Sequence, residues 1–191
     1  MAPKRGGEPT SPKGGGKKAK KNEITDPPER DSEGRAFFLL KKPVDEGGEA
    51  KELEGKKDNT APFTGLHNHV SKKVMQHMQV GDQVLLYRYN NTRTDAKADP
   101  PGITGICEVV KAPYPDPEDE EEGGFLAVDL KLLEVFEEPI SAALLKKHKG
   151  DKELRSWLFF KKGVSTVFPM SPQQFDIVVN LEEEPAGQGE G

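Results

Sequence analysis

A helix gives way to a strand within residues 78–90, which read MQVGDQVLLYRYN. Gly81 and Asp82 mark the change, because both residue types favour turns over regular structure. Upstream of them, apolar side chains recur every four residues, which predicts a helix over about 65–79. Downstream, residues 83–89 are rich in side chains that favour a strand.

Further strands are predicted on both sides of this segment. The run Phe37-Phe38-Leu39-Leu40 is short and wholly apolar, which is typical of a buried strand. Residues 103–111 have the same character, and residues 125–135 alternate between apolar and polar side chains. Two more short apolar segments, at 157–160 and 164–168, are also predicted to be strands.

The last helix has the clearest end signals. Ser171 is placed to cap its N-terminus, Pro172 occupies the first helical position, and Gln174 completes a capping box. A shorter helix is predicted to begin at Pro139. Strands interleaved with a few helices predict an α+β, barrel-like domain over residues 34–182. Its polar segments are predicted to be loops, at 43–62, 90–101 and 113–124.

The two ends of the chain differ in composition from the middle. Residues 1–33 are rich in Gly, Pro and Lys without periodicity, which predicts a disordered basic tail, and residues 183–191 predict a disordered acidic tail. Residues 1–22 hold seven Lys or Arg against one Glu, whereas the remainder holds 21 basic and 32 acidic residues. The basic tail predicts a nuclear import signal, with the nucleus as location and the import machinery as a partner. A solubilising tail is the alternative, and contact with a phosphate backbone would be a second use of the same residues. The import signal would consist of Lys4, Arg5, Lys17, Lys18, Lys20 and Lys21.

Composition excludes several classes of protein. The chain of 191 residues has one cysteine, Cys107, which excludes an internal disulfide and a cysteine-based zinc site. No run reaches the roughly 18 apolar residues that would span a membrane, and the N-terminus has no apolar secretory signal. We therefore expect a protein of a reducing compartment that carries no cofactor and does not enter a membrane.

Five groups of residues in the predicted domain resemble, in order, motifs of the EVE-domain family, thymocyte nuclear protein type. This resemblance implies a PUA-like fold, that is, a mixed β-barrel with a few packed helices. It also implies a monomeric, non-enzymatic nuclear protein that binds a modified base of DNA or RNA in a pocket lined by the first strand and the following helix. The motifs are FFLLKKP at 37–43, FTGLHNHV at 63–70, MQVGDQVLLYRYN at 78–90, PGITG at 101–105 with APYPD at 112–116, and MSPQQFDIVVNL at 170–181.

Some family positions are substituted in this chain. The two tryptophans of the family fall on Phe37 and Phe63, and an aspartate falls on Thr64, so an acidic acceptor is absent. Its arginine and tyrosine fall on His67 and His69. A base pocket needs flat apolar surfaces and polar groups that face the base edge. The candidates are Phe37, Phe63, Thr64, Gly65, Asn68, Tyr87 and Asn90 for the pocket, and Lys72, Lys73, Arg88 and Arg93 for the phosphate backbone.

Other interpretations stay open for these residues. The aromatic residues are equally consistent with a core, and the basic ones with a solvated helix face and loop. The acidic balance of the domain repels phosphate, which favours a protein-interaction module with a decayed base pocket as the alternative function. An enzyme is disfavoured, because the sequence offers no catalytic residues and no metal site. His67 and His69, two residues apart, would not face one ligand.

Overall fold

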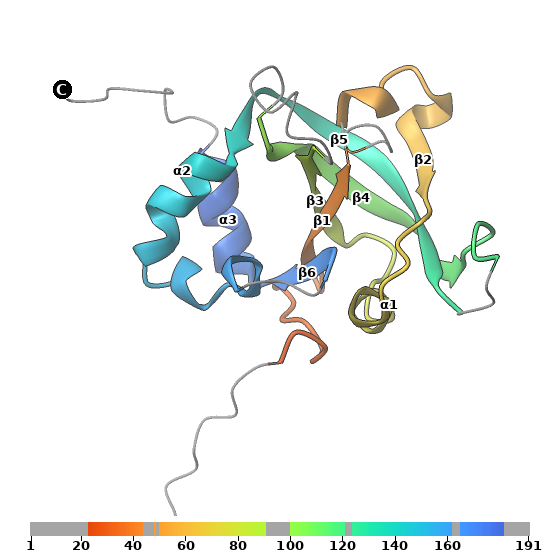
Figure 1. Cartoon of the computed structure of the whole chain (residues 1–191), viewed down its shortest axis with the longest axis horizontal. Coiled ribbons are helices and arrows are strands. Elements are labelled where there is room, and N and C mark those ends of the chain that lie inside the picture. The colour runs from red at the N-terminus through yellow and green to blue at the C-terminus, as the bar shows by residue number, and fades with distance from the viewer. Residues whose placement is uncertain are drawn as a thin grey trace, which may run out of the picture.

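The structure is a computed structural model that describes residues 23–43, 48, 50–90, 100–120, 124–161 and 165–181. Within these residues the strands form one six-stranded mixed sheet in the order β2-β5-β4-β3-β1-β6 (Figure 1). Strands β1 and β3 are parallel, and the other neighbouring pairs are antiparallel. The strands are β1 (Phe37–Pro43), β2 (Thr60–Phe63), β3 (Gln83–Tyr89), β4 (Gly102–Pro115), β5 (Leu126–Ser141) and β6 (Val167–Met170).

Helices cover both faces of the sheet (Figure 1). α1 follows β2 after a short connection and joins the first core through Val74 and Met75, whereas α2 and α3 join the second core on the opposite face. Short 3-10 turns complete the chain between these elements. The α-helices are α1 (His69–Met75), α2 (Ala142–Lys147) and α3 (Pro172–Asn180). The 3-10 turns are η2 (Ala50–Leu53), η3 (Lys57–Asn59), η4 (His148–Gly150), η5 (Leu154–Ser156) and η6 (Leu158–Phe160).

The alternation of side chains along the central strands divides the interior into two cores. In β1, Phe38 and Leu40 point into a first core with α1, whereas Phe37 and Leu39 point into a second core with α2, α3 and Trp157. Successive strand residues face opposite sides. A strand that is covered on both faces must be apolar throughout, which explains the unbroken run at the start of β1.

The predicted α+β fold is confirmed, and so are several of its elements. β3 lies where the sequence placed it, and β1 continues the predicted run at 37–40 as far as Pro43. β4 includes the predicted strand at 103–111, and β5 begins one residue after the predicted start at 125 and continues to Ser141. In α3, the Ser171 hydroxyl accepts from Gln174 N at 3.1 Å, and Gln174 Oε1 accepts from Ser171 N at 3.0 Å. The predicted capping box is therefore confirmed.

Four predicted elements differ from the structure. The helix predicted over 65–79 is confined to α1, because Asn68 caps it late, and β2 and two 3-10 turns lie within the loop predicted at 43–62. The apolar run at 157–160 forms a 3-10 turn on the second core instead of a strand. The helix predicted from Pro139 begins at Ala142, because Ser141 supplies the cap and Pro139 still belongs to β5.

The folded part also begins earlier than predicted. Residues 23–33, assigned from the sequence to a disordered tail, lie in the described structure and join residues 34–36 in a segment that we call the N-terminal strap (residues 23–36). Its Arg30 forms an ion pair with Asp82, and Arg30 and Ala36 form an isolated β-bridge. A single anchoring side chain leaves no periodic pattern, so composition alone missed it. Residues 1–22 and 182–191 lie outside the described residues. No helix in the described part is long and apolar enough to cross a membrane.

Cys107 provides a test of the first core. It lies in β4 with no exposed surface, and burial raises the pKa of its thiol to about 12. We expect a thiol reagent to label it at pH 8 only after the chain unfolds. Because the folded pKa exceeds the unfolded one, Cys107 favours the folded state below the unfolded pKa of about 8.5, and this contribution falls as pH rises toward 12. Rapid labelling without denaturant would contradict the buried placement.

Candidate functional site

The connection between β2 and α1 contains most of the motif shared with the resembled family. β2 ends at Phe63, and Gly65 adopts a φ of 72°, a left-handed conformation that glycine takes without strain. Asn68 then caps α1, because its side-chain oxygen accepts from Val70 N and Ser71 N, both at 2.9 Å. Two of the positions that match the family motif, Gly65 and Asn68, thus set the path of this connection.

The tip of the β4–β5 hairpin packs against this connection. Asp116 is buried there; its Oδ2 accepts from Gly65 N at 2.8 Å and lies 3.3 Å from His67 Nε2. The Phe125 ring lies 5.1 Å from the rings of both His67 and His69, centroid to centroid. The two histidines therefore hold the hairpin, a role that their spacing in the sequence did not reveal.

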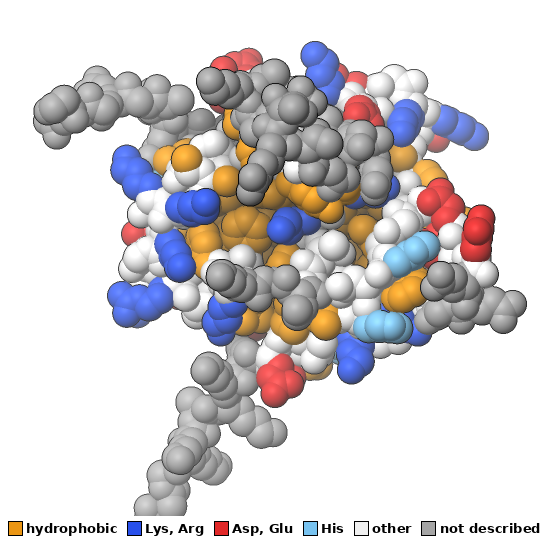
Figure 2. Space-filling view, viewed as in Figure 1, with side chains coloured by type: hydrophobic (Ala, Val, Ile, Leu, Met, Phe, Trp, Pro, Cys, Tyr) orange, Lys and Arg blue, Asp and Glu red, His pale blue; other side chains and the backbone are white. Residues whose placement is uncertain are grey.

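Acidic residues of the same hairpin lie close to the connection. If Gly65 carried a Cβ, that atom would lie 3.8 Å from Glu118 Oε2. Figure 2 shows histidine side chains near acidic ones on the side of the molecule that carries α1 and the hairpin tip. The sequence predicted a polar loop at 113–124, whereas the structure turns the carboxylate of Asp116 inward to accept from the backbone N–H groups of Gly65 and Glu118.

The end of β1 presents one lysine to each face of the sheet. Lys42 Nζ lies 5.5 Å from the centre of the Phe63 ring. On the opposite face, Lys41 Nζ lies 5.5–5.8 Å from the ring centres of Tyr87, Tyr89 and Phe159. Burial lowers the pKa of Lys41 and raises that of Tyr87. Figure 2 shows apolar side chains gathered around a basic one near the middle of the view.

The structure does not bring the three predicted pocket rings to one place. Phe63 belongs to the first core, and Phe37 and Tyr87 belong to the second. Phe37 packs on Phe175 of α3 with ring centres 4.4 Å apart, and Tyr87 packs on Phe159 at 5.3 Å. Because strand residues alternate between faces, Phe37 points away from Phe63. Phe63, Thr64, Gly65 and Asn68 are consecutive or nearly so and stay together, whereas Asn90 lies beyond the end of β3.

The predicted phosphate contacts are also spread out. Lys72 and Lys73 both lie on α1, Lys72 half-buried and Lys73 exposed, whereas Arg88 is 8% exposed and its Nε donates to the Pro100 carbonyl oxygen at 3.1 Å. That burial gives Arg88 a structural role in place of a surface contact. Arg93 lies outside the described residues, as do Lys4, Arg5, Lys17, Lys18, Lys20 and Lys21 of the predicted import signal.

A buried hydroxyl cluster fixes α1 against β6. Ser71 Oγ accepts from Thr166 N at 2.8 Å and lies within hydrogen-bond distance of the hydroxyls of Ser165 and Thr166. Lys41 N in turn donates to the Thr166 carbonyl oxygen at 2.7 Å. α1, β6 and the end of β1 are thereby joined next to the Lys42–Phe63 pair. Sequence reasoning missed these residues, because neither a serine within a helix, such as Ser71, nor Ser165 and Thr166 ahead of β6 carry a positional signal.

A groove of about 1100 Å³ lies elsewhere, between the N-terminal strap and residues 152–161. None of the predicted site residues lines it. The groove is therefore separate from the site at the β2–α1 connection, where side chains surround the buried Phe63 ring.

Comparisons with a family model and with known proteins all point to the same family. The EVE domain family model matches residues 37–181. Thymocyte nuclear protein 1 of Gallus gallus is 25% identical over 163 residues, which cover 76% of this chain and 64% of that protein. The Homo sapiens protein of the same name is 24% identical over 163 residues, which cover 76% of this chain and 69% of that protein.

Solved structures share the fold. The crystal structure of the human THYN1 protein in complex with 5-methylcytosine-containing DNA has a TM-score of 0.66 at 22% identity, and the match covers 78% of this chain and 98% of that chain. A hypothetical protein from Leishmania major has a TM-score of 0.65 at 25% identity, with 80% and 98% covered. The six-stranded sheet and its helices are therefore an arrangement common to these proteins.

Proposed function

Because this chain belongs to the EVE-domain family, we propose that it is a binding module, not an enzyme, that recognises nucleic acid and reads one modified base. A structure with the same fold, human THYN1, was solved in complex with 5-methylcytosine-containing DNA. The family relationship supports the class of function, and the identity of the base is left to the experiment below. The basic residues at 1–22 and the names of the relatives support a nuclear location.

The observation that carries the proposal is the Lys42 ammonium over the Phe63 ring, 5.5 Å from its centre. Thr64, Gly65 and Asn68 follow Phe63 in the same connection. A cation is attracted to the face of an aromatic ring, and a nucleobase stacks on the same face. A base that enters would replace the ammonium on Phe63, and Lys42 could then turn toward a phosphate. The Thr64 hydroxyl and the Asn68 amide would supply contacts to the base edge.

A substitution at Asn68 can separate its role in capping α1 from its proposed contact with the base edge. Serine is as good a helix cap as asparagine, so Asn68→Ser should keep α1 while it removes the amide. We expect the variant to lose about 10-fold of the preference for a modified over an unmodified oligonucleotide, since a base-edge contact contributes about 1–3 kcal/mol of discrimination. The melting temperature should stay close to that of the parent.

The measurement is binding of the full chain to matched oligonucleotides with and without modified cytosine or adenine, at low and at physiological salt. Lys73→Gln, on the exposed part of α1, is the control: it should weaken binding to all oligonucleotides alike and reduce the salt dependence. An unchanged preference in Asn68→Ser would remove Asn68 from the proposed pocket.

A protein-interaction role is the second candidate, and the acidic hairpin favours it. Glu118 lies beside Gly65, and negative charge there opposes the approach of a phosphate. In that case binding to every oligonucleotide would be weak, unselective and lost at physiological salt. Recovery from nuclear extract of a protein partner that stays bound to the chain after nuclease treatment would support this role. Loss of all bound partners after nuclease treatment would contradict it.

A further inference from the structure

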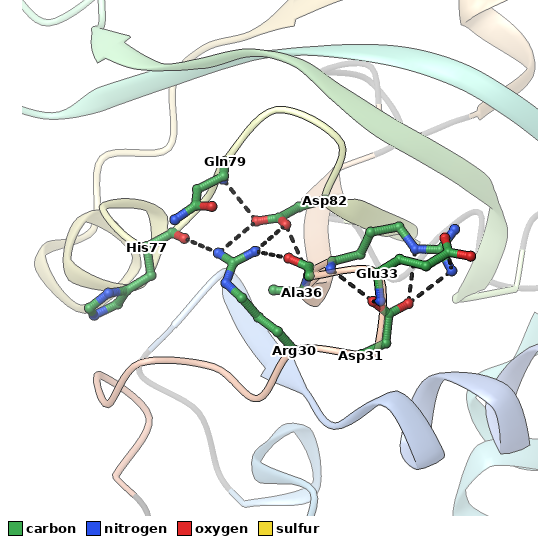
Figure 3. A network of polar contacts seen from close by, with 9 residues as sticks. Arg30, Asp31, Glu33, Ala36, His77, Gln79 and Asp82 are labelled. Atoms are coloured by element: carbon green, nitrogen blue, oxygen red, sulfur yellow. Dashed lines mark hydrogen bonds and ion pairs between the residues drawn. The ribbon is translucent and has the colours of Figure 1, made fainter.

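The N-terminal strap is fixed to the domain by an ion pair whose carboxylate, that of Asp82, is buried. Arg30 Nη1 donates to Asp82 Oδ1 at 2.7 Å, and Arg30 Nη2 donates to the His77 carbonyl oxygen at 3.0 Å (Figure 3). Asp82 Oδ1 also accepts from Ala36 N, and Asp82 Oδ2 from Gln79 N. Residues 23–29 extend from this anchor, and His77 Nε2 lies 3.2 Å from the Thr25 carbonyl oxygen. The strap is thus a defined wall of the molecule.

The groove of about 1100 Å³ lies between this strap and residues 152–161. Trp157, Met170 of β6 and Gln174 of α3 contribute to its lining. Gln174 Nε2 donates to the Glu153 carbonyl oxygen at 3.0 Å and to Ser156 Oγ at 3.1 Å, which ties α3 to η5. The volume exceeds the roughly 300–1000 Å³ of small-molecule sites. A segment of polypeptide therefore fits it better than a single small ligand.

The two walls of the groove carry opposite charges. The strap contributes Glu23, Asp26 and Glu29, and the facing wall contributes Lys152, Arg155 and Lys161 together with Glu153. In the described part of the chain, no hydrogen bond or ion pair connects these two walls; Lys152 is 3.9 Å from Glu153 on its own wall. Each wall therefore offers its charges to a ligand that lies between them.

Trp157 is a buried residue of the groove lining. It is 1% exposed, and its ring packs on Phe159 and Phe160 within the second core. Its indole Nε1 is buried and has no acceptor among the described residues. A ligand in the groove would therefore not reach this N–H directly, but the indole resonance reports on changes in the lining.

We propose that this groove binds an extended peptide segment of a protein partner in which basic and acidic side chains alternate. Successive side chains of an extended chain point to opposite sides, so the basic ones would face Glu23, Asp26 and Glu29 and the acidic ones Lys152, Arg155 and Lys161. Nucleic acid fits less well, because its phosphates would meet the carboxylates of the strap. The groove shares no residue with the Lys42–Phe63 site, so this inference stands apart from the proposed function.

Trp157 also provides the probe, since it is the chain's one tryptophan. Its indole N–H gives a single resonance in a ¹⁵N-correlated NMR spectrum of the full chain. The titrants are the capped peptide (Lys-Glu)5 and the block peptide of the same composition, five lysines followed by five glutamates, each up to about 1 mM. We expect the alternating peptide to change the chemical shift of the indole proton, because the peptide packs on the lining to which Trp157 belongs. We also expect it to bind about 5-fold more tightly than the block peptide, as weak exposed ion pairs allow. No shift, or equal binding of the two peptides, would overturn the proposal.

Charge-reversal variants locate the effect. Glu29→Lys on the strap and Arg155→Glu on the facing wall should each weaken binding of the alternating peptide about 5-fold. Both residues are exposed, so the fold should be retained. Glu138→Lys, an exposed residue of β5 outside the groove, is the matched control and should bind like the parent. Equal losses of peptide affinity in all three variants would mean that only the net charge of the protein matters, not the position of the charge. An indole shift with oligothymidylate would assign the groove to nucleic acid, and either result would overturn the proposal.

Discussion

Replacement of Asp82 with alanine is expected to lower the free energy of unfolding by about 3 kcal/mol, because a buried carboxylate that accepts several hydrogen bonds is removed and each unmet buried donor costs about 1–3 kcal/mol. The Asp82 side chain is 2% exposed and accepts from Arg30, Ala36 N and Gln79 N (Figure 3). Without the carboxylate, Arg30 and Ala36 N of the strap and Gln79 N after α1 lose their acceptor. Because a domain of this size is stable by about 5–15 kcal/mol, denaturant unfolding should show the loss clearly.

The neighbouring ion pair is the control for this prediction. Glu33 pairs with Arg35 at 3.0 Å, but its side chain is 66% exposed, and exposed pairs add little to stability. Glu33→Ala should therefore leave the unfolding midpoint nearly unchanged. A double-mutant cycle of Asp82→Ala with Arg30→Met should show strong coupling. Additive losses would mean that the strap is anchored by contacts other than this pair.

The second large effect is expected at Phe63. The ring is 3% exposed within the first core, so Phe63→Ala should cost about 3–5 kcal/mol through the cavity that it leaves. A loss of binding in that variant would not separate a missing contact from partial unfolding. Phe63→Leu, which keeps most of the volume, should cost only about 1–1.5 kcal/mol. If a base stacks on the ring, the leucine variant should still lose about 10-fold or more in nucleic-acid affinity.

Phe136 is a suitable match for this comparison. It is also 3% exposed, but it lies in β5 on the second core. Phe136→Leu should lower stability by a similar amount and leave nucleic-acid affinity unchanged, as measured by calorimetric titration beside thermal unfolding. Similar affinities for the two leucine variants would exclude Phe63 as a stacking surface.

Local signals predicted the parts of the fold whose cause lies within a few residues. One example is the capping box of α3, in which Ser171 and Gln174 form hydrogen bonds with each other. Another is the apolar run at the start of β1, where every residue is buried on one or the other face of the sheet. β2 shows the opposite case. Its sequence, Thr60-Ala61-Pro62-Phe63, contains a proline and has no strand pattern, and it becomes a strand only because it pairs with β5 at the edge of the sheet.

The sequence predicted the part of the candidate site whose residues are adjacent in one motif. It did not predict the part that depends on which face of the sheet a strand residue points to. Phe63, Thr64, Gly65 and Asn68 stay together because they are close in sequence. Phe37 was grouped with them through the family resemblance, yet the alternation along β1 directs it to Phe175 on the other face. The partners of Asp116 and Ser71 come from distant segments, so no local pattern could have indicated them.

The position of β6 in the sheet affects how the protein is made. β1 lies between β3 and β6, so the first of the described strands to leave the ribosome needs as a neighbour the last of the described strands to be synthesised. Contacts between such distant segments slow folding, because a long loop must close before they form. During translation, one edge of the apolar β1 strand stays unpaired until residues 167–170 have emerged. During that interval we expect chaperones that recognise exposed apolar strands to bind the nascent chain.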